Sequence, residues 1–281
     1  MIRDGLFGLA IVLASTGAGF AETQVERGGY LVNSILTCGN CHTPRGPGGV
    51  IDMAKQLSGG PQTFDEPAFT VTGANLTPDR ETGLGDWSAA DIKRALLEGK
   101  RPNGAQLAPI MPYAFYKVFT PGDLDAVVAY LRSVPAVSNK VAAPVYKAEL
   151  QFAPPPDADK PPSEADLRDP VKRGRYLATI GHCMECHTKK VNGRHDFGNL
   201  GRGGEEFPGP WGVSVSRNIT SSKDKGLGGW TDAEIKRAIT QGVHKDGSPL
   251  KPPMGFALYA KMTDDDLNAV IAYLRTVPAK E

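Results

Sequence analysis

Two short motifs of the form C-x-x-C-H constrain this chain more than any other feature. They are Cys38-x-x-Cys41-His42 and Cys183-x-x-Cys186-His187, and together they use all 4 cysteines of the 281-residue sequence. Equivalent positions of the two motifs lie 145 residues apart. A chain that repeats so specific a pattern is expected to contain two copies of one fold.

The sequence around the motifs repeats as well. Gly-Leu-Gly-x-Trp at 83–87 recurs at 226–230, and Ala-Tyr-Leu-Arg at 129–132 recurs at 272–275. A period this long in only two copies indicates a duplicated domain and not a solenoid. The expected organisation is a leader at 1–21, a first domain at 22–137, a proline-rich linker at 138–169 and a second domain at 170–281.

Both copies are expected to be all-α, because apolar residues recur at helical spacing and no segment shows a convincing alternating strand. A first helix is expected at 27–36 and again at 171–180. Gly28 and Gly174, with the tyrosines two residues further on, are expected to let the first and last helices cross closely. The residues expected to cap the middle and last helices are Ser88, Thr231, Thr120 and Thr263.

The N-terminus predicts export. Residues 1–21 carry one basic residue, an apolar run from Leu6 to Ala14 and small residues before Ala21, which is typical of a secretory signal peptide cleaved after Ala21. An uncleaved anchor is the alternative, although the run is short for a bilayer. No later segment reaches 18 apolar residues, so the mature protein is expected to be soluble and periplasmic, with no firm membrane anchor.

The charge balance argues against one class of partner. Lys and Arg total 32 and Asp and Glu total 31, which gives a formal net charge of +1. Nucleic-acid binding usually requires a strongly basic domain or face. No nucleic-acid partner is therefore expected.

C-x-x-C-H is the attachment signature of c-type haem. The two thiols add to the haem vinyl groups as thioethers, and the histidine offers a ring nitrogen to the iron. A disulfide within each pair and a single Cys₄ zinc site are the alternatives, but neither explains why a histidine follows each pair. We therefore expect two covalently attached haems, held by the residues Cys38, Cys41, Cys183 and Cys186, with His42 and His187 as iron ligands.

The second axial ligand is predicted to be a methionine. Met184 lies between two cysteines, Met53 has no counterpart in the other copy, and Met262 is expected to pack in the core. Met111 and Met254 occupy matched positions in proline-containing loops, whose restricted backbones suit a loop that holds a thioether in place. Met111 and Met254 are therefore the predicted ligands.

Four further matched residues are candidates for contacts to the haem propionates. They are Asn75, Asn218, Trp87 and Trp230. Buried carboxylates need hydrogen-bond donors, which these side chains carry. The alternative is structural, with each asparagine shaping a turn and each tryptophan packing in the core.

Together these features resemble class I c-type cytochromes. The resemblance rests on Arg-Gly-x-Tyr-Leu before each C-x-x-C-H, on Asn-[Leu/Ile]-Thr, on Gly-Leu-Gly-x-Trp and on the methionine loops. Over nearly all of the mature chain, the sequence is similar to the multihaem cytochrome c subunits of alcohol and gluconate dehydrogenases. This resemblance implies an electron carrier without enzymatic activity of its own. It would accept electrons from a redox protein such as a dehydrogenase and pass them to a cytochrome or a terminal oxidase.

The competing class is a di-haem redox enzyme, either peroxidase-like or thiosulfate dehydrogenase-like. A peroxidase needs an iron whose second axial position can open, and the matched methionine loops argue against that. A cysteine-ligated thiosulfate dehydrogenase site would need a fifth cysteine, because all 4 are used by the motifs.

Overall fold

The computed structural model describes residues 21–46, 49–60, 63–150, 154–156, 159–209 and 211–281. The predicted signal peptide at 1–21 therefore lies outside the described residues, except for Ala21 itself.

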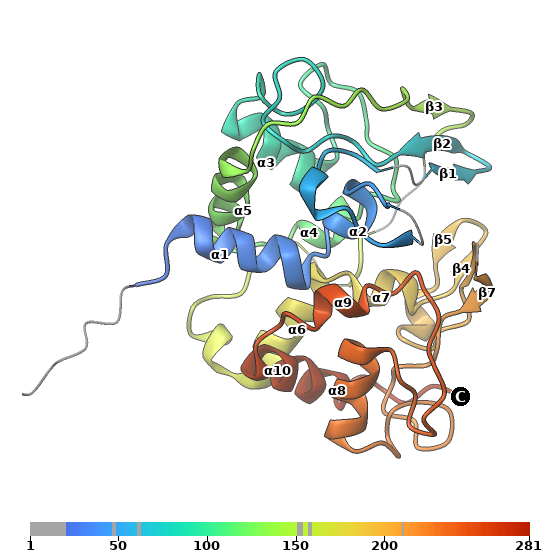
Figure 1. Cartoon of the computed structure of the whole chain (residues 1–281). Helices are drawn as coiled ribbons and strands as arrows, with labels where there is room; N and C mark the ends of the chain where they lie inside the picture. Colours follow the sequence, from blue (N-terminus) through green and yellow to red (C-terminus); the bar gives the residue numbers. More distant parts are fainter. Residues whose placement is uncertain (1–20, 47–48, 61–62, 151–153, 157–158, 210) are drawn as a thin grey trace, which may run out of the picture.

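Two sets of helices follow one another in the same order, as Figure 1 shows from blue to red. The first set comprises α1 (Gln24–Tyr30), continued by the π-helix η1 (Leu31–Ile35), then α2 (Gly39–His42), α3 (Ala89–Glu98), α4 (Tyr113–Tyr116) and α5 (Pro121–Ser133). The second set comprises α6 (Pro170–Ile180), α7 (Cys183–Cys186), α8 (Asp232–Gln241), α9 (Phe256–Tyr259) and α10 (Asp264–Leu274). Short 3₁₀ segments are η3 (Met53–Lys55), η4 (Asp166–Arg168) and η5 (Phe197–Asn199).

The predicted starts of the middle and last helices are confirmed, whereas the first helix begins at Gln24, three residues before the predicted start at 27. Ser88 and Thr231 form complete capping boxes with the acidic residue three positions on. Thr120 and Thr263 each accept a hydrogen bond from the third residue of the last helix. Side chains that accept from these otherwise unpaired N–H groups fix where each helix begins.

The first and last helices of each set cross closely, as the matched glycines predict. A Cβ atom added at Gly28 would lie 1.9 Å from the carbonyl oxygen of Ala126, and one at Gly174 would lie 1.8 Å from that of Ala269. Both distances are far below van der Waals contact. Only glycine therefore permits α1 to pack on α5 and α6 to pack on α10 at this separation.

The tyrosines beside these glycines join the two sets to each other. The Tyr30 hydroxyl of α1 donates to Asp266 of α10 at 2.5 Å, and the Tyr176 hydroxyl of α6 donates to Asp123 of α5 at 2.7 Å. Each bond runs from the first helix of one set to the last helix of the other. The exchange is reciprocal, so the two sets are tied together at two equivalent points.

Both aspartates also pair with an arginine of their own set. Arg27 Nε lies 2.8 Å from Asp123, and an Arg173 guanidinium nitrogen lies 2.5 Å from Asp266. The aspartate side chains are only 10% and 2% exposed, and buried carboxylates of this kind are normally paired. The spacing of Asp266 from Thr263 suggests a capping box, but the Asp266 carboxylate binds Tyr30 and Arg173 instead.

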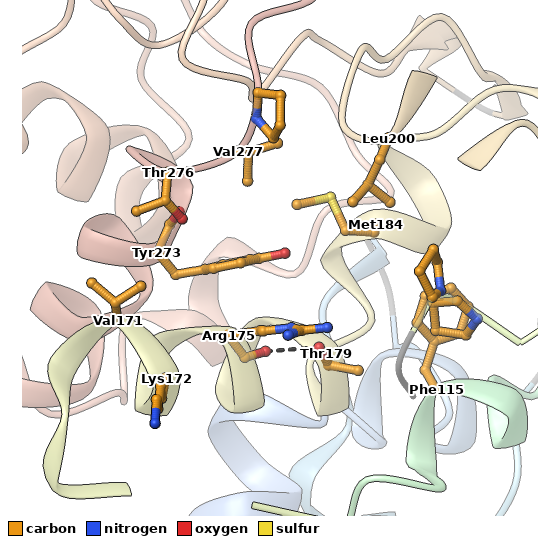
Figure 2. A pocket seen from close by; sticks show the side chains of 13 residues that line it. Phe115, Val171, Lys172, Arg175, Thr179, Met184, Leu200, Tyr273, Thr276 and Val277 are labelled. Carbon is orange, nitrogen blue, oxygen red and sulfur yellow. Dashed lines mark hydrogen bonds between the residues drawn. The ribbon is translucent and has the colours of Figure 1, made fainter. Parts of the chain in front are cut away.

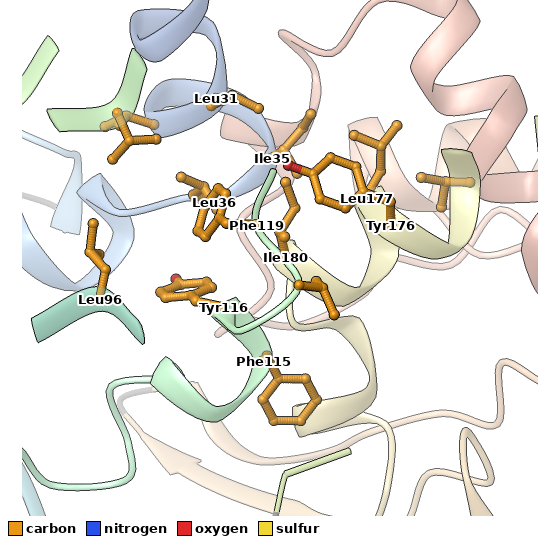
Figure 3. Close-up of a cluster of buried hydrophobic side chains, with 14 of the residues drawn as sticks. Leu31, Ile35, Leu36, Leu96, Phe115, Tyr116, Phe119, Tyr176, Leu177 and Ile180 are labelled. Carbon is orange, nitrogen blue, oxygen red and sulfur yellow. The ribbon is translucent and has the colours of Figure 1, made fainter. Parts of the chain in front are cut away.

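A single apolar core runs through both sets (Figure 3). Leu31 and Ile35 of the first set lie beside Leu177 and Ile180 of the second set in this cluster. All four side chains are almost fully buried. Burial of apolar surface is the main stabilising contribution in such a contact, so the two sets share part of their stability.

The expectation that the loops contain no strands is wrong. Three strands form an antiparallel sheet in the order β1 (Thr63–Glu66), β2 (Phe69–Thr72) and β3 (Val145–Tyr146). Two further hairpins are β4 (Lys190–Val191) with β5 (Arg194–His195), and β6 (Glu206–Gly209) with β7 (Gly212–Val215). Most residues of these strands are partly or fully exposed, so the apolar alternation that marks a half-buried strand is missing from the sequence.

The segment expected to be a linker first packs along the first set. Asn139 donates its side-chain amide to the carbonyl of Ser58 at 2.8 Å, and the Lys147 N–H donates to Ala68 at 2.8 Å. The Tyr146 hydroxyl donates to the carbonyl of Gln106 at 2.7 Å. The first part of 138–169 is therefore held by hydrogen bonds to residues that precede it in the chain.

Candidate functional site

Each C-x-x-C-H motif forms one helical turn. Cys38 precedes α2, and its carbonyl accepts the His42 N–H at 2.9 Å, while the carbonyl of Cys183 accepts the His187 N–H at 3.1 Å. One turn thus places both cysteines and the histidine of a motif next to one another. We call these two turns the attachment turns, at 38–42 and 183–187.

The alternatives to haem attachment gain no support from the geometry. All four cysteines are free thiols, so neither pair forms a disulfide. Among the residues that the structure describes, no three of His, Cys, Asp and Glu are grouped as ligands for a metal ion.

The histidines of both turns are oriented in the same way. His42 Nδ1 lies 2.8 Å from the carbonyl oxygen of Ala74, and His187 Nδ1 lies 2.6 Å from that of Arg217. Because a carbonyl only accepts, Nδ1 carries the proton and Nε2 keeps a free lone pair. Burial lowers the pKa of both rings, which favours the neutral form. A neutral imidazole held through its other nitrogen is the arrangement of a metal ligand, so these residues fit a haem.

The loop that follows each turn is anchored identically. The buried hydroxyl of Thr43 accepts from the Leu57 N–H at 3.0 Å, and that of Thr188 accepts from the Gly201 N–H at 3.2 Å. These threonines are not among the predicted site residues. The signal was present, because threonine follows the histidine in both motifs.

Two glycines hold the histidine backbones. The Gly59 N–H donates to the carbonyl of His42 at 2.9 Å, and the Gly203 N–H donates to that of His187 at 2.7 Å. The φ angles of the two glycines are +99° and +76°, a region that other residues rarely adopt. The two copies therefore share the backbone contacts around the histidine as well as its side-chain bond.

The four cysteines are partly buried. Burial raises the pKa of Cys38 to about 12 and that of Cys41 and Cys183 to about 11, and it raises the pKa of Cys186 as well. The free cysteines therefore stay protonated at neutral pH, and they are not the exposed thiolates expected of a redox-active pair.

The two predicted methionine ligands lie in equivalent loops. The carbonyl of Met111 accepts the Tyr113 N–H at 2.8 Å just before α4, and the carbonyl of Met254 accepts the Phe256 N–H at 3.0 Å just before α9. Both side chains are partly buried. By contrast, Met184, which the sequence excludes as a ligand, is buried in the core. That Met111 and Met254 bind iron stays a prediction.

The matched asparagines form turns. The Asn75 side-chain oxygen accepts from the N–H and the hydroxyl of Thr77, and its amide donates to the carbonyl of Val137 at 2.7 Å. Asn218 makes the same bonds to Thr220 and donates to the carbonyl of Lys280 at 2.7 Å. Both side chains thus tie a turn to the segment after the last helix, which is the structural role weighed above. The propionate role stays a prediction.

The matched tryptophans lie at equivalent places against the core. Both side chains are partly buried and pack on it. The carbonyl of Trp87 accepts from Arg132 at 2.7 Å, and that of Trp230 accepts from Arg275 at 2.6 Å. These bonds link the start of the middle helix to the end of the last helix in each set.

The two attachment turns lie close together, α2 and α4 facing α9 and α7 in Figure 1. Burial, and next the charge of Glu185 in the second turn, raise the pKa of Cys41 in the first turn. Tyr116 of α4 is buried and interacts electrostatically with Cys41 and Glu185, and these effects raise its pKa. The equivalent Tyr259 of α9 is partly buried, and burial and the thiols of the second turn raise its pKa in the same way. Neither tyrosine is among the predicted site residues, although the two occupy matched positions of the repeat.

A separate hollow of about 410 Å³ opens beside the second turn, between α6 and α10 (Figure 2). Arg175 and Thr179 of α6, Tyr273 of α10 and Met184 line it, with Phe115 of the first set. None of the predicted thioether or iron-ligand residues lines this hollow. We therefore assign the candidate haem sites to the attachment turns and not to this hollow.

Comparison with known families identifies the second copy. Residues 171–278 match the sequence model of the cytochrome c family. This segment is a cytochrome c domain, a class that carries covalently attached c-type haem. The matched segment contains the second attachment turn and Met254. The resemblance to class I c-type cytochromes is thus confirmed.

Curated relatives extend over the whole chain. A gluconate 2-dehydrogenase cytochrome c subunit of Pantoea cypripedii is 29% identical over 305 residues, which cover 97% of this chain and 65% of that subunit. A fructose dehydrogenase cytochrome subunit of Gluconobacter japonicus is 29% identical over 283 residues, covering 94% of this chain and 55% of that subunit. A diheme cytochrome c-type protein of Cereibacter sphaeroides is 29% identical over 307 residues and is covered completely, as is this chain. The chain therefore spans only 55% to 65% of those two dehydrogenase subunits.

Within the described part of the chain, no helix combines the length and the apolar character needed to cross a membrane.

Proposed function

We propose that this chain is an exported di-haem c-type cytochrome that transfers single electrons. The donor is a dehydrogenase or another redox protein, and the acceptor is a cytochrome or a terminal oxidase. In this proposal, residues 22–137 and 170–281 are two tandem class I cytochrome c domains joined by 138–169. Residues 1–21 direct the protein to the periplasm and are then removed.

The matched hydrogen bonds of the two histidines carry the proposal. His42 and His187 each place Nδ1 on a backbone carbonyl, of Ala74 and Arg217 respectively, at the same point of the repeat. The first copy therefore has the histidine geometry of the copy that matches the cytochrome c family. A purely structural role for the histidine would not explain why it follows a pair of free cysteines in the same geometry in both copies.

The chain supplies the other functions of such a site. The four thiols would form the thioether bonds to haem, and the loops before α4 and α9 would hold Met111 and Met254 as second ligands. Bound haem supplies one-electron chemistry through its ferric and ferrous states. With a histidine and a methionine both bound, the iron would have no open position for a substrate, which favours electron transfer over catalysis at the metal.

The relatives support a dehydrogenase as the donor. Two of them are named as cytochrome subunits of gluconate and fructose dehydrogenases. The diheme relative, which this chain covers completely, supports the number of two haems.

The first test counts the haems. Intact-mass spectrometry of the exported protein should show two added haem masses. The double substitution Cys38→Ser with Cys41→Ser should remove one, and the matched pair Cys183→Ser with Cys186→Ser should remove the other. A parent protein with one haem or none would overturn the proposal.

The second test concerns the axial ligands and the absence of enzyme activity. Met111→Ala and Met254→Ala should each remove part of the methionine–iron charge-transfer absorption of the ferric protein. Retention of the whole band in both variants would refute the assignment of these ligands. Rapid turnover of peroxide or thiosulfate by the isolated protein would instead indicate a di-haem enzyme.

A further inference from the structure

One side chain of the first attachment turn reaches the methionine loop of the other copy. Asn40 lies between Cys38 and Cys41, and its Nδ2 donates to the carbonyl oxygen of Pro253 at 2.9 Å. Pro253 directly precedes Met254, the predicted second-site ligand. The bond thus connects residues 213 positions apart that belong to different predicted haem sites.

The orientation of the Asn40 amide follows from its other partner. Arg45 donates from one guanidinium nitrogen to Asn40 Oδ1 at 2.8 Å and to the Asn40 carbonyl at 3.2 Å. A guanidinium only donates, so the amide oxygen must face Arg45 and the NH₂ group must face Pro253. Asn40 is therefore held as a donor towards the methionine loop.

Gly255, on the other side of Met254, also lies close to the first turn. A Cβ atom added at Gly255 would lie 3.6 Å from Thr37 Cγ2 and 3.8 Å from Asn40 Cγ. The side chain of Tyr259, in the helix that follows, also interacts with that of Thr37. Pro253 is thus hydrogen-bonded to the first turn, and Gly255 lies close to the segment that leads into it.

The equivalent contact is not available in the opposite direction. The residue that corresponds to Asn40 in the second turn is Glu185, 145 positions later. Its carboxylate Oε2 lies 3.1 Å from His182 Nδ1, and an ionised carboxylate has no proton to donate to a carbonyl. Glu185 therefore cannot hold the Met111 loop as Asn40 holds the Met254 loop.

We propose that Asn40 is a positioning residue for Met254, so that the attachment turn of the first haem stabilises the axial ligation of the second. This inference rests on the proposed function, since it requires Met254 to be an iron ligand. It makes the two sites unequal in a stated direction. The stability of the bond between Met254 and its iron depends on the first turn. The stability of the bond between Met111 and its iron does not depend on Glu185.

The experiment compares Asn40→Asp with Glu185→Gln in the full di-haem protein. Asn40→Asp keeps the size of the side chain and an acceptor for Arg45 but removes the donor to Pro253. Imidazole is titrated into the oxidised protein, and displacement of each axial methionine is followed by the hyperfine-shifted methyl signals in proton NMR. Met111→Ala and Met254→Ala assign the two signals.

Asn40→Asp should lower the imidazole concentration that half-displaces Met254 by about three- to tenfold, the effect of losing one hydrogen bond. The value for Met111 should stay within about twofold, as should the Met254 value in Glu185→Gln. If Asn40→Asp does not assemble with two haems, Asn40→Ala carries the same expectation.

An unchanged Met254 value in the Asn40 variant, or equal changes at both methionines, would overturn the inference. Failure of the proposed function gives a different result. In that case Met254→Ala in the parent protein would remove no methionine signal at all.

Discussion

Removing the Tyr30 hydroxyl should destabilise the protein through the contact between the two helix sets. In Tyr30→Phe, the Asp266 carboxylate loses a donor at 2.5 Å, and the Thr263 N–H loses an acceptor at 3.1 Å. The Asp266 side chain is 2% exposed, so water cannot replace the lost donor. A hydrogen bond to a charged group contributes about 1.5–3 kcal/mol, and we expect the free energy of unfolding to fall by about 2 kcal/mol.

The equivalent substitution Tyr176→Phe should cost somewhat less, about 1.5 kcal/mol, because the Asp123 side chain is 10% exposed and its bond to Tyr176 is longer, at 2.7 Å. The matched control is Tyr146→Phe, which removes a hydroxyl bond of 2.7 Å from a residue that is 39% exposed. Its cost should stay below about 1 kcal/mol.

The assay is equilibrium denaturation of the di-haem protein by guanidinium chloride, followed by far-UV circular dichroism. The order of destabilisation should be Tyr30→Phe, then Tyr176→Phe, then Tyr146→Phe. If the first two variants were no less stable than the third, the reciprocal hydrogen bonds would not stabilise the fold as argued.

Burial and the paired aspartates raise the pKa of the same two tyrosine hydroxyls above the ordinary value of 10.0. Above about pH 10 the unfolded chain therefore loses protons that the folded chain retains, so the free energy of unfolding should fall as pH rises. The fall should be less steep when both tyrosines are replaced by phenylalanine. The same pH dependence in the parent protein and the double variant would contradict this. Gly28→Ala places a Cβ 1.9 Å from the carbonyl oxygen of Ala126 and should lower the melting temperature strongly, whereas Gly122→Ala, with nothing within 4 Å, should leave it unchanged or raise it. Thr43→Val leaves the Leu57 N–H without its acceptor at 3.0 Å and should cost about 1–3 kcal/mol in urea denaturation. A loss below about 0.5 kcal/mol would mean that this loop is anchored elsewhere.

The helices were predictable because their signals are local. Ser88 and Thr231 cap their helices with both reciprocal bonds, and Thr120 begins a helix with proline at its first position. Each signal depends on a few neighbouring residues, and the repeat presents it twice. The strands were not predictable, because exposed hairpins are held by backbone bonds that leave no apolar alternation.

The site was predictable as far as its motifs are local. The spacing of the cysteines and the histidine reveals the chemistry of each attachment turn. The partners of the histidine rings, Ala74 and Arg217, are backbone carbonyls and therefore leave no trace in the sequence. The contact between Asn40 and Pro253 joins segments 213 positions apart, and only the packing of one copy on the other brings them together.

The Tyr30–Asp266 and Tyr176–Asp123 bonds have a consequence for the pairing of the two halves of the chain. Such a swap of identical contacts is what an isologous homodimer makes about a twofold axis. Because both halves belong to one polypeptide, this pairing does not depend on protein concentration. Each half can also differ from the other, as asparagine at position 40 and glutamate at position 185 do.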